Sequence, residues 1–484
     1  MRMIRAMTTD RTGPATRRVL RCHDEARDGT AARLAHGLAA AIAGCTGRDV
    51  AVADHTGAPS VRLVRPDGRA DAWLDAPAAA ALVRKVPFVL FVTDPRVPAA
   101  EQAALERLAD RTLLAAADTA TANRWLEAVA VAAEAPEHGR AVVLPRRAAR
   151  PERAVAVHRW PLEGFGADLA LLRIARREIG MATGLVLGGG SARGYAHVGV
   201  LQVLREEGIS WDMLAGTSGG GYVAGMWAAG MAPERIWELC VEETVHRNPL
   251  GDYTLPVTAL VKGQKVRASV KRAYGDIGIE DLPLDFFVMA TDLLTGQPVL
   301  LDHGPLGLSC LASASLPGIF PPVRRAPWLL IDGGVLFNVP GPQMKARGAD
   351  IVIAVDLATD RGQAFGPAAT KPNGWLRRVL RKSGHVREAM DAPGIVPILL
   401  RSLELMMLGA VRAHAWSFDV HIRPDVNEFG TLDWAAHAPL VERGQAAARA
   451  SMPAIRRALA LHRERVQRDV DAAVDGALQL VLRA

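Results

Sequence analysis

Two glycine-rich segments and a distant aspartate contain the residue types that ester hydrolysis requires. The first segment is a run of three glycines, Gly188, Gly189 and Gly190, and the second is Gly-Thr-Ser-Gly-Gly around Ser218. The aspartate is Asp332, which is followed by two glycines. A serine hydroxyl attacks an ester carbonyl when a base takes its proton and backbone N–H groups stabilise the oxyanion. The sequence therefore predicts a serine hydrolase with Ser218 as nucleophile, Asp332 as base and the three glycines as oxyanion hole.

The elements around these residues are those that can position them. The apolar residues 184–187 predict a strand before the glycine run, and the pattern over residues 197–207 predicts a helix after it. A second strand over residues 211–215 leads to Ser218, where small neighbours permit a sharp strand-to-helix turn. Backbone N–H groups at such helix starts point toward the same place as the helix dipole, which favours an anion there.

A dinucleotide-binding loop is the alternative interpretation of the glycine run. That fingerprint needs the spacing GxGxxG and an acidic residue at the carboxyl end of the next strand. Asp212 lies at a suitable distance, but it precedes the apolar residues and so marks the beginning of the strand. Ser191 also interrupts the glycine spacing. A nucleotide-binding oxidoreductase is therefore the weaker alternative.

Five ordered blocks resemble the patatin-like phospholipases, and among them the bacterial relatives of neuropathy target esterase. The blocks are residues 185–204, the segment around Ser218, and residues 290–296, 312–323 and 332–340. The resemblance implies a three-layer α/β sandwich that hydrolyses acyl esters of phospholipids or lysophospholipids. It also implies a catalytic dyad of Ser218 and Asp332 without a histidine. Many family members have glycine where this chain has Ser191, which adds a Cβ to the loop.

Asp332 needs a raised pKa to act as a base, because a free aspartate has a pKa of about 3.9. It follows the apolar residues 328–331, and burial there would raise its pKa. A catalytic triad in the order Ser–Asp–His is also available formally, although the candidate histidines have no distinguishing context: His385, His414, His421 and His437.

Two further polar residues lie close to the glycine run. His197, on the helix that follows, is predicted to support the loop rather than to act as a base. Arg193 is a candidate contact for a substrate phosphate, and a structural ion pair is an equal alternative.

Composition indicates the surroundings in which the chain works. A net charge of +7 and a pI near 9.5 favour anionic partners. The sequence contains no basic array with interleaved aromatic residues, so we expect the partner to be a membrane surface rather than nucleic acid. It contains no zinc-ligand spacing, and we expect neither a metal nor a cofactor.

The cysteines and the first residues indicate the compartment. The four cysteines form no CxxC pair and the first residues lack an apolar core, which predicts a cytoplasmic protein, peripheral on the inner membrane face. The oligomeric state stays open.

Three regions are expected along the chain. Residues 1–180 alternate helical patterns with short apolar strands, which predicts a doubly wound α/β domain of unknown role. Residues 181–360 form the catalytic domain, and the mostly helical residues 361–484 complete it. In this last region residues 375–382 are expected to form a basic amphipathic helix, whose basic face either contacts a membrane or is exposed to solvent. Residues 395–411 are expected either to border a site for the acyl chain or to pack in the core. A catalytically weak lipid-binding regulatory protein is the alternative outside enzymes.

Overall fold

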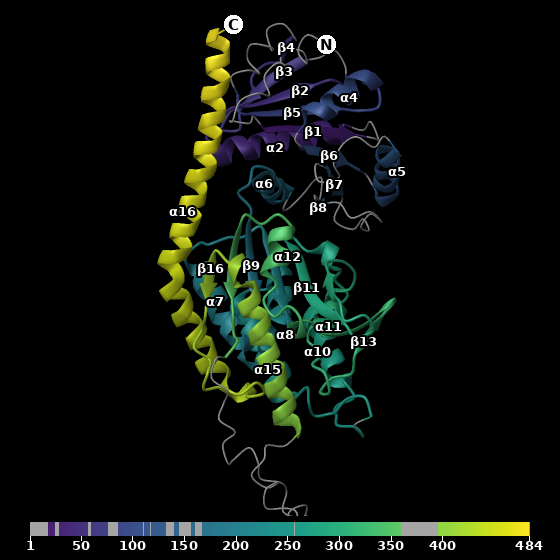
Figure 1. The fold of residues 1–484 in the computed structure, drawn as a ribbon, viewed down its shortest axis with the longest axis vertical. Coiled ribbons are helices and arrows are strands. Elements are labelled where there is room, and N and C mark those ends of the chain that lie inside the picture. The colour runs from purple at the N-terminus through teal and green to yellow at the C-terminus, as the bar shows by residue number, and fades with distance from the viewer. Residues whose placement is uncertain are drawn as a thin grey trace, which may run out of the picture. The chain divides into compact units, whose positions relative to one another are not determined.

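The computed structural model describes residues 18–24, 29–56, 60–75, 86–109, 111–116, 118–131, 140–144, 156–159, 167–255, 257–359 and 395–483 (Figure 1). The chain divides into two compact units. The first contains Met1–Ala182, Arg347–Asp350 and Arg457–Ala484, and the second contains Thr183–Ala346 and Ile351–Arg456. Domain boundaries at residues 180 and 360 stay predictions. The basic helix expected over residues 375–382 and the candidate His385 lie outside the described residues.

The first unit contains an eight-stranded sheet in the order β4-β3-β2-β5-β1-β6-β7-β8. The pairs from β2 through β5, β1, β6 and β7 to β8 are parallel, and β3 and β4 extend one edge in antiparallel pairing. The strands are β1 (Arg18–Asp24), β2 (Val50–Asp54), β3 (Ser60–Val64), β4 (Leu74–Asp75), β5 (Phe88–Thr93), β6 (Arg111–Ala115), β7 (Arg140–Leu144) and β8 (Ala156–Arg159).

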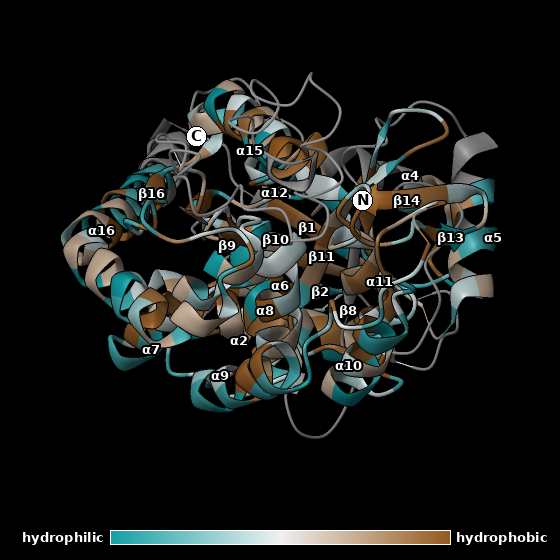
Figure 2. Cartoon of the chain, turned by 90° about the horizontal axis from the view of Figure 1, so that it is seen from below, coloured by the Kyte–Doolittle hydropathy of each residue, from teal (hydrophilic) through white to brown (hydrophobic). Residues whose placement is uncertain are grey.

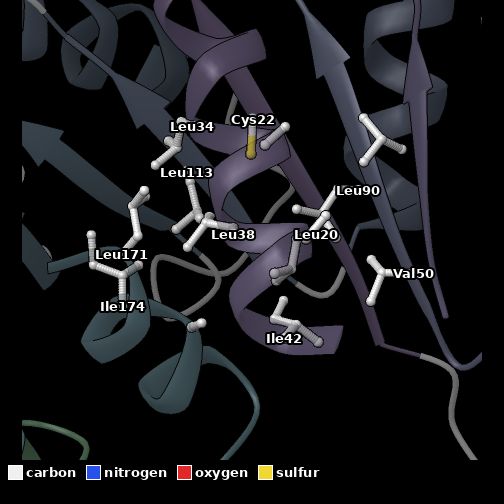
Figure 3. Packing of buried hydrophobic residues seen from close by; sticks show 14 of the residues in the cluster. Leu20, Cys22, Leu34, Leu38, Ile42, Val50, Leu90, Leu113, Leu171 and Ile174 are labelled. Carbon is white, nitrogen blue, oxygen red and sulfur yellow. The ribbon is translucent and has the colours of Figure 1, made fainter. Parts of the chain in front are cut away.

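Helices cover both faces of this sheet. Successive side chains of a strand point to opposite faces. On β1, Leu20 and Cys22 pack with Leu34 and Leu38 of α2 (Thr30–Thr46), and α6 (Ala167–Glu178) joins the same cluster (Figure 3). The intervening Val19 faces the other side, where α4 (Ala99–Leu108) packs, and α5 (Thr119–Val131) covers the strands β6 and β7 from that side. The expected doubly wound α/β domain is therefore confirmed.

The second unit contains another mixed sheet, in the order β13-β14-β11-β10-β9-β15-β16, with β12 paired to β11. The central pairs from β11 to β16 are parallel, and β12, β14 and β13 are antiparallel. The strands are β9 (Thr183–Leu187), β10 (Met213–Thr217), β11 (Asp285–Asp292), β12 (Pro298–Leu301), β13 (Val323–Arg325), β14 (Trp328–Asp332), β15 (Ile351–Val355) and β16 (Val420–Ile422). The strand expected over residues 211–215 begins two residues later, because the Asp212 carboxylate accepts the N–H and hydroxyl of Thr183 at the strand's entry.

The helices of the second unit connect these strands and carry the site. They are α7 (Tyr195–Glu206), α8 (Ser218–Ala228), α9 (Pro233–Val241), α10 (Gln264–Tyr274), α11 (Leu306–Ser313), α12 (Gly341–Ala346), α15 (Ile395–His414) and the first part of α16 (His437–Arg483). Short helical turns are η2 (Ser191–Gly194), η3 (Glu242–His246) and η5 (Gly333–Val335). Figure 2 shows α11 in the colour of hydrophobic residues, in agreement with its burial. Within the part of the chain that the structure describes, no helix is long and apolar enough to cross a bilayer.

Helices α7 and α16 cross with their backbones in direct contact. A Cβ added to Gly199 of α7 would lie 2.0 Å from the carbonyl oxygen of Val441, and one added to Gly444 of α16 would lie 1.9 Å from that of Ala196. Neither oxygen belongs to a flexible side chain, so the two helices would have to separate to admit a methyl group.

We therefore expect Gly199→Ala and Gly444→Ala each to destabilise the second unit by about 3 kcal/mol, the cost of overpacking a close contact. The midpoint of thermal unfolding measures this effect. The matched control is Gly409→Ala in α15, where an added Cβ meets nothing within 4 Å. That change should be neutral or stabilise by up to about 1 kcal/mol, because alanine has the better helix propensity. Equal midpoints for Gly444→Ala and Gly409→Ala would contradict the close crossing.

Candidate active site

Ser218 lies on a sharp turn between a strand and a helix. It follows Thr217, the last residue of β10, and is the first residue of α8. Its φ of 53° is in the left-handed region, which non-glycine residues rarely adopt, and its side chain is buried. The Ser218 N–H donates to the Ser313 hydroxyl at 2.9 Å. A strained serine at this kind of turn directs its hydroxyl away from the strand and over the start of the helix.

The turn contacts the glycine loop backbone to backbone. A Cβ on Gly220 would lie 2.3 Å from the carbonyl oxygen of Leu187, and one on Gly219 would lie 2.9 Å from that of Ser191. Gly216 is as crowded, because its added Cβ would lie 2.6 Å from the N–H nitrogen of Gly221. The glycines around Ser218 are therefore required by close approach.

Two of the three N–H groups expected to form the oxyanion hole are already hydrogen-bonded, so this part of the prediction is wrong. The Gly188 N–H donates to the Val355 carbonyl at 2.9 Å, and the Gly189 N–H donates to the Asn338 carbonyl at 3.2 Å. Both donors are occupied because the loop continues β9 and bonds to the neighbouring backbone. The N–H groups of Gly190 and Ser191 have no hydrogen bond to any described residue. The candidate oxyanion donors are therefore those of Gly190 and Ser191.

Ser191 interrupts the glycine spacing of the loop. Its φ is 51°, again in the left-handed region. A glycine adopts this conformation without the steric cost that a Cβ adds. Ser191 therefore has a steric cost at this position that a glycine would avoid.

Asp332 is fully buried at the end of β14, two strands away from β10 in the sheet. Its Oδ1 accepts the N–H of Gly334 at 2.7 Å, and its Oδ2 has no partner with full hydrogen-bond geometry among the described residues. Burial raises the pKa of Asp332 to about 7, and the Ser218 hydroxyl and the Gly334 N–H act in the opposite direction. Ser218 is thus close enough to stabilise the carboxylate, and the carboxyl group is suited to accept a proton near neutral pH.

Two side chains hold the glycine loop from outside. His197 Nε2 donates to the Gly188 carbonyl at 2.7 Å, and burial lowers the pKa of His197 to about 4, so the ring is neutral. Asn338 Nδ2 donates to the Gly189 carbonyl at 3.3 Å, so Asn338 bonds both polar groups of Gly189. The sequence indicated the loop-supporting place of His197 but not that of Asn338. Its only signal was its position in the block at residues 332–340.

The histidines that could complete a triad have other contacts. No described histidine lines either cavity that reaches Ser218. Each of the three described candidates contacts another residue, His414 stacking on Phe337, His421 bonding Asp356 and His437 accepting from Trp237. The part of the chain in the structure contains no group of three His, Cys, Asp or Glu side chains that could hold a metal ion.

Arg193 does not provide a free phosphate contact. Its buried guanidinium bonds the Glu404 carboxylate at 2.9 Å and the Phe429 carbonyl at 2.9 Å. Glu404 also accepts from Arg401 and Thr431. A desolvated guanidinium is stable only when its charge is paired and its donors are bonded. The structural ion pair, the alternative considered from the sequence, is the one observed.

Ser218 lies between two cavities, which share Ser191 and Leu316 as well. The larger has an empty volume of about 800 Å³ including its open mouth, and mainly apolar groups line it, among them Tyr195, Tyr222, Val223, Val266 and Phe320. The smaller has about 400 Å³, again including its mouth, and the polar residues in its lining include Arg193, Asn338, Thr359, Glu404 and Thr431.

Comparison with known proteins relates the segment that contains this site to a known family. Residues 185–343 match the family model described as patatin-like phospholipase. An uncharacterized NTE family protein of Mycobacterium tuberculosis is 36% identical over 304 residues, which are 62% of this chain and 50% of that protein. A protein named lysophospholipase NTE1 from Saccharomyces cerevisiae is 30% identical over 270 residues, 54% of this chain and 16% of that protein. The chain thus spans about half the length of its mycobacterial relatives and less of the yeast one.

Among solved structures, VipD from Legionella pneumophila aligns with a TM-score of 0.32 and 12% identity, over 58% of this chain and 67% of that one. The residues matched by the family model contain the glycine loop, the Ser218 turn and Asp332. With these three parts in one buried site, residues 185–343 form a patatin-like phospholipase domain.

Proposed function

We propose that this protein hydrolyses the acyl ester bonds of phospholipids or lysophospholipids through Ser218 and Asp332. The observation that carries the proposal is the buried carboxyl group of Asp332. Its Oδ2 has no hydrogen-bond partner among the described residues and can accept the proton of the Ser218 hydroxyl, whose backbone is strained. A carboxylate with a pKa of about 7 is a stronger base than an exposed aspartate, and it is ionised in about half of the molecules at neutral pH.

The proposed reaction has two halves. Asp332 Oδ2 takes the hydroxyl proton as Ser218 Oγ attacks the ester carbonyl carbon, and the N–H groups of Gly190 and Ser191 stabilise the oxyanion. The C–O bond to the alcohol then breaks, and Asp332 returns the proton to the alcohol. In the second half Asp332 takes a proton from water, which attacks the acyl-enzyme. The carboxylic acid leaves, and Ser218 recovers its proton.

The two cavities supply places for the two halves of such an ester. The apolar cavity suits the acyl chain, since Tyr222, Val266 and Phe320 offer it hydrocarbon contacts. The smaller cavity suits the polar alcohol that leaves, because hydroxyl and amide groups line it. The names of the yeast relative and of the matched family support a lipid ester as the substrate. The scheme needs neither metal nor organic cofactor, and attachment to the inner membrane face remains part of the proposal.

Removal of the nucleophile is the first test. Ser218→Ala should lower ester hydrolysis by about 10⁴-fold or more and abolish labelling by a fluorophosphonate probe, because covalent catalysis requires the hydroxyl. Ser315→Ala is a matched control, since this buried hydroxyl donates to the Leu311 carbonyl and lies outside the lining of both cavities. Hydrolysis by Ser218→Ala at the level of Ser315→Ala would overturn the assignment of the nucleophile.

The second test separates a dyad from a triad. Asp332→Asn should reduce kcat/KM by about 10³-fold or more, because an amide cannot accept the serine proton. The variants His414→Ala, His421→Ala and His437→Ala should retain substantial activity, since their contacts lie elsewhere. We would abandon the dyad if any of these histidine variants were as inactive as Asp332→Asn.

The pH dependence of kcat/KM follows from the pKa of Asp332. Its base form is lost on protonation, so kcat/KM should fall about tenfold for each pH unit below about 7 and level off above it. The measurement is a pH profile with a small soluble ester. A profile that stays flat between about pH 5 and pH 8 would show that another group is the base.

The same pKa has the opposite consequence for stability. Because the folded-state pKa lies above the unfolded value, the contribution of Asp332 to the free energy of unfolding is fully present below about pH 4 and is lost as the pH rises through about 7. Asp332→Asn removes this loss. Its thermal midpoint relative to wild type should therefore be higher at about pH 8 than at about pH 5. A pH-independent difference would indicate that Asp332 is not desolvated in solution.

A further inference from the structure

A loop between η3 and α10 exposes three large apolar side chains. The exposed fractions are 72% for Tyr253, 79% for Leu255 and 81% for Val257, and these three residues define what we call the apolar loop. Single exposed apolar residues are ordinary on protein surfaces, but several on one short loop indicate a surface that another apolar phase covers.

The loop is held in place on the wall of the site. Its returning arm bonds the segment beside the apolar cavity, through the Leu260 N–H to the Gly318 carbonyl at 2.9 Å and the Val261 N–H to the Ile319 carbonyl at 3.3 Å. Within the loop, the Thr254 N–H donates to the Leu260 carbonyl at 3.0 Å. The side chains of the apolar loop are therefore presented by an anchored backbone.

The base of the loop is continuous with the apolar cavity. Leu250 and Leu260 belong to one hydrophobic cluster with Leu316, Phe320 and α15, whose first turns lie beside the loop in Figure 1. Pro249 precedes the loop and Val266 follows it, and both line the cavity that reaches Ser218. A substrate entering this cavity from an apolar phase would pass residues on either side of the loop.

Basic side chains follow the apolar loop directly. Lys262, Lys265 and Arg267 are exposed, and none has an ion pair with a described residue. The Asp252 carboxylate accepts the Gln264 and Lys265 N–H groups at the start of α10. Apolar side chains beside unpaired cations match the interface of a bilayer, in which hydrocarbon lies beneath a layer of phosphate groups.

We propose that the apolar loop inserts into the surface of an anionic phospholipid bilayer and that Lys262, Lys265 and Arg267 contact its phosphate groups. This proposal rests on the proposed function, because a lipid substrate is what gives the cavity a reason to open on a membrane. Docking in this way would bring the mouth of the cavity to the lipid, so that an acyl chain reaches Ser218 without crossing water.

The test is flotation of the full chain, in the Ser218→Ala background, with vesicles of phosphatidylcholine alone or mixed with phosphatidylglycerol. The loop variant replaces Tyr253, Leu255 and Val257 with serine, and the charge variant replaces Lys262, Lys265 and Arg267 with glutamine. The matched control is Leu293→Ser with Leu294→Ser, since these leucines are 53% and 63% exposed on the turn between β11 and β12.

The loop variant should bind either vesicle at least about tenfold more weakly, because three apolar side chains no longer leave water. The charge variant should lose about fivefold per cation on the anionic vesicles at low salt, and little on phosphatidylcholine alone. The leucine control should bind as the parent does. Unchanged flotation of the loop variant, equal loss in the leucine control, or a change of oligomeric state in place of vesicle binding would overturn the proposal.

Hydrolysis of a short-chain soluble ester, measured with Ser218 restored, distinguishes the two proposals. The loop variant should hydrolyse this ester as wild type does but act more weakly on vesicles. If wild-type protein binds vesicles through the loop yet hydrolyses neither substrate, the proposed function fails and the docking surface stands. If it hydrolyses the soluble ester and the loop variant acts on vesicles as well as wild type does, the docking surface fails alone.

Discussion

Contact between backbones without intervening side chains determines the geometry of this site. The first turn of α8 touches the end of β9 at Gly220, and the residue after Asp332 touches β11, where a Cβ on Gly333 would lie 2.2 Å from the Met289 carbonyl oxygen. Backbone atoms in contact cannot shift by a rotamer change, so the turn, the loop and β14 hold fixed spacings. Ser218 and Asp332, the proposed nucleophile and base, are therefore positioned by main chain rather than by flexible side chains.

The same rigidity allows a carboxyl group to remain desolvated. Asp332 has one oxygen satisfied by the Gly334 N–H, and the other, which has no hydrogen-bond partner among the described residues, is the proposed acceptor of the Ser218 proton. A second buried donor on that oxygen would stabilise the fold and lower the pKa of Asp332, which would weaken it as a base. The left-handed backbones of Ser191 and Ser218 are further local costs at this site. Their concentration around one hydroxyl is typical of sites where stability is given up for function.

Polar support comes from parts of the chain far from the glycine loop. The neutral His197 and Asn338 hold the loop carbonyls, and α15 provides Glu404, which pairs with Arg193. Met407, from the same helix, lines the smaller cavity with Glu404. The segment after the predicted catalytic domain therefore contributes to the wall of the site. The ion pair explains why Arg193 is buried without requiring a ligand.

The sequence by itself determined the local framework. Apolar residues before Gly188 and Ser218 predict the two strands, small residues predict the turn, and the apolar residues before Asp332 predict its burial, because strand formation and burial follow from nearby residues. Only the tertiary structure decided which backbone N–H groups of the glycine loop are free to bind an oxyanion. The Gly188 and Gly189 N–H groups bond Val355 and Asn338, and such partners depend on how distant segments pack, which no local pattern records.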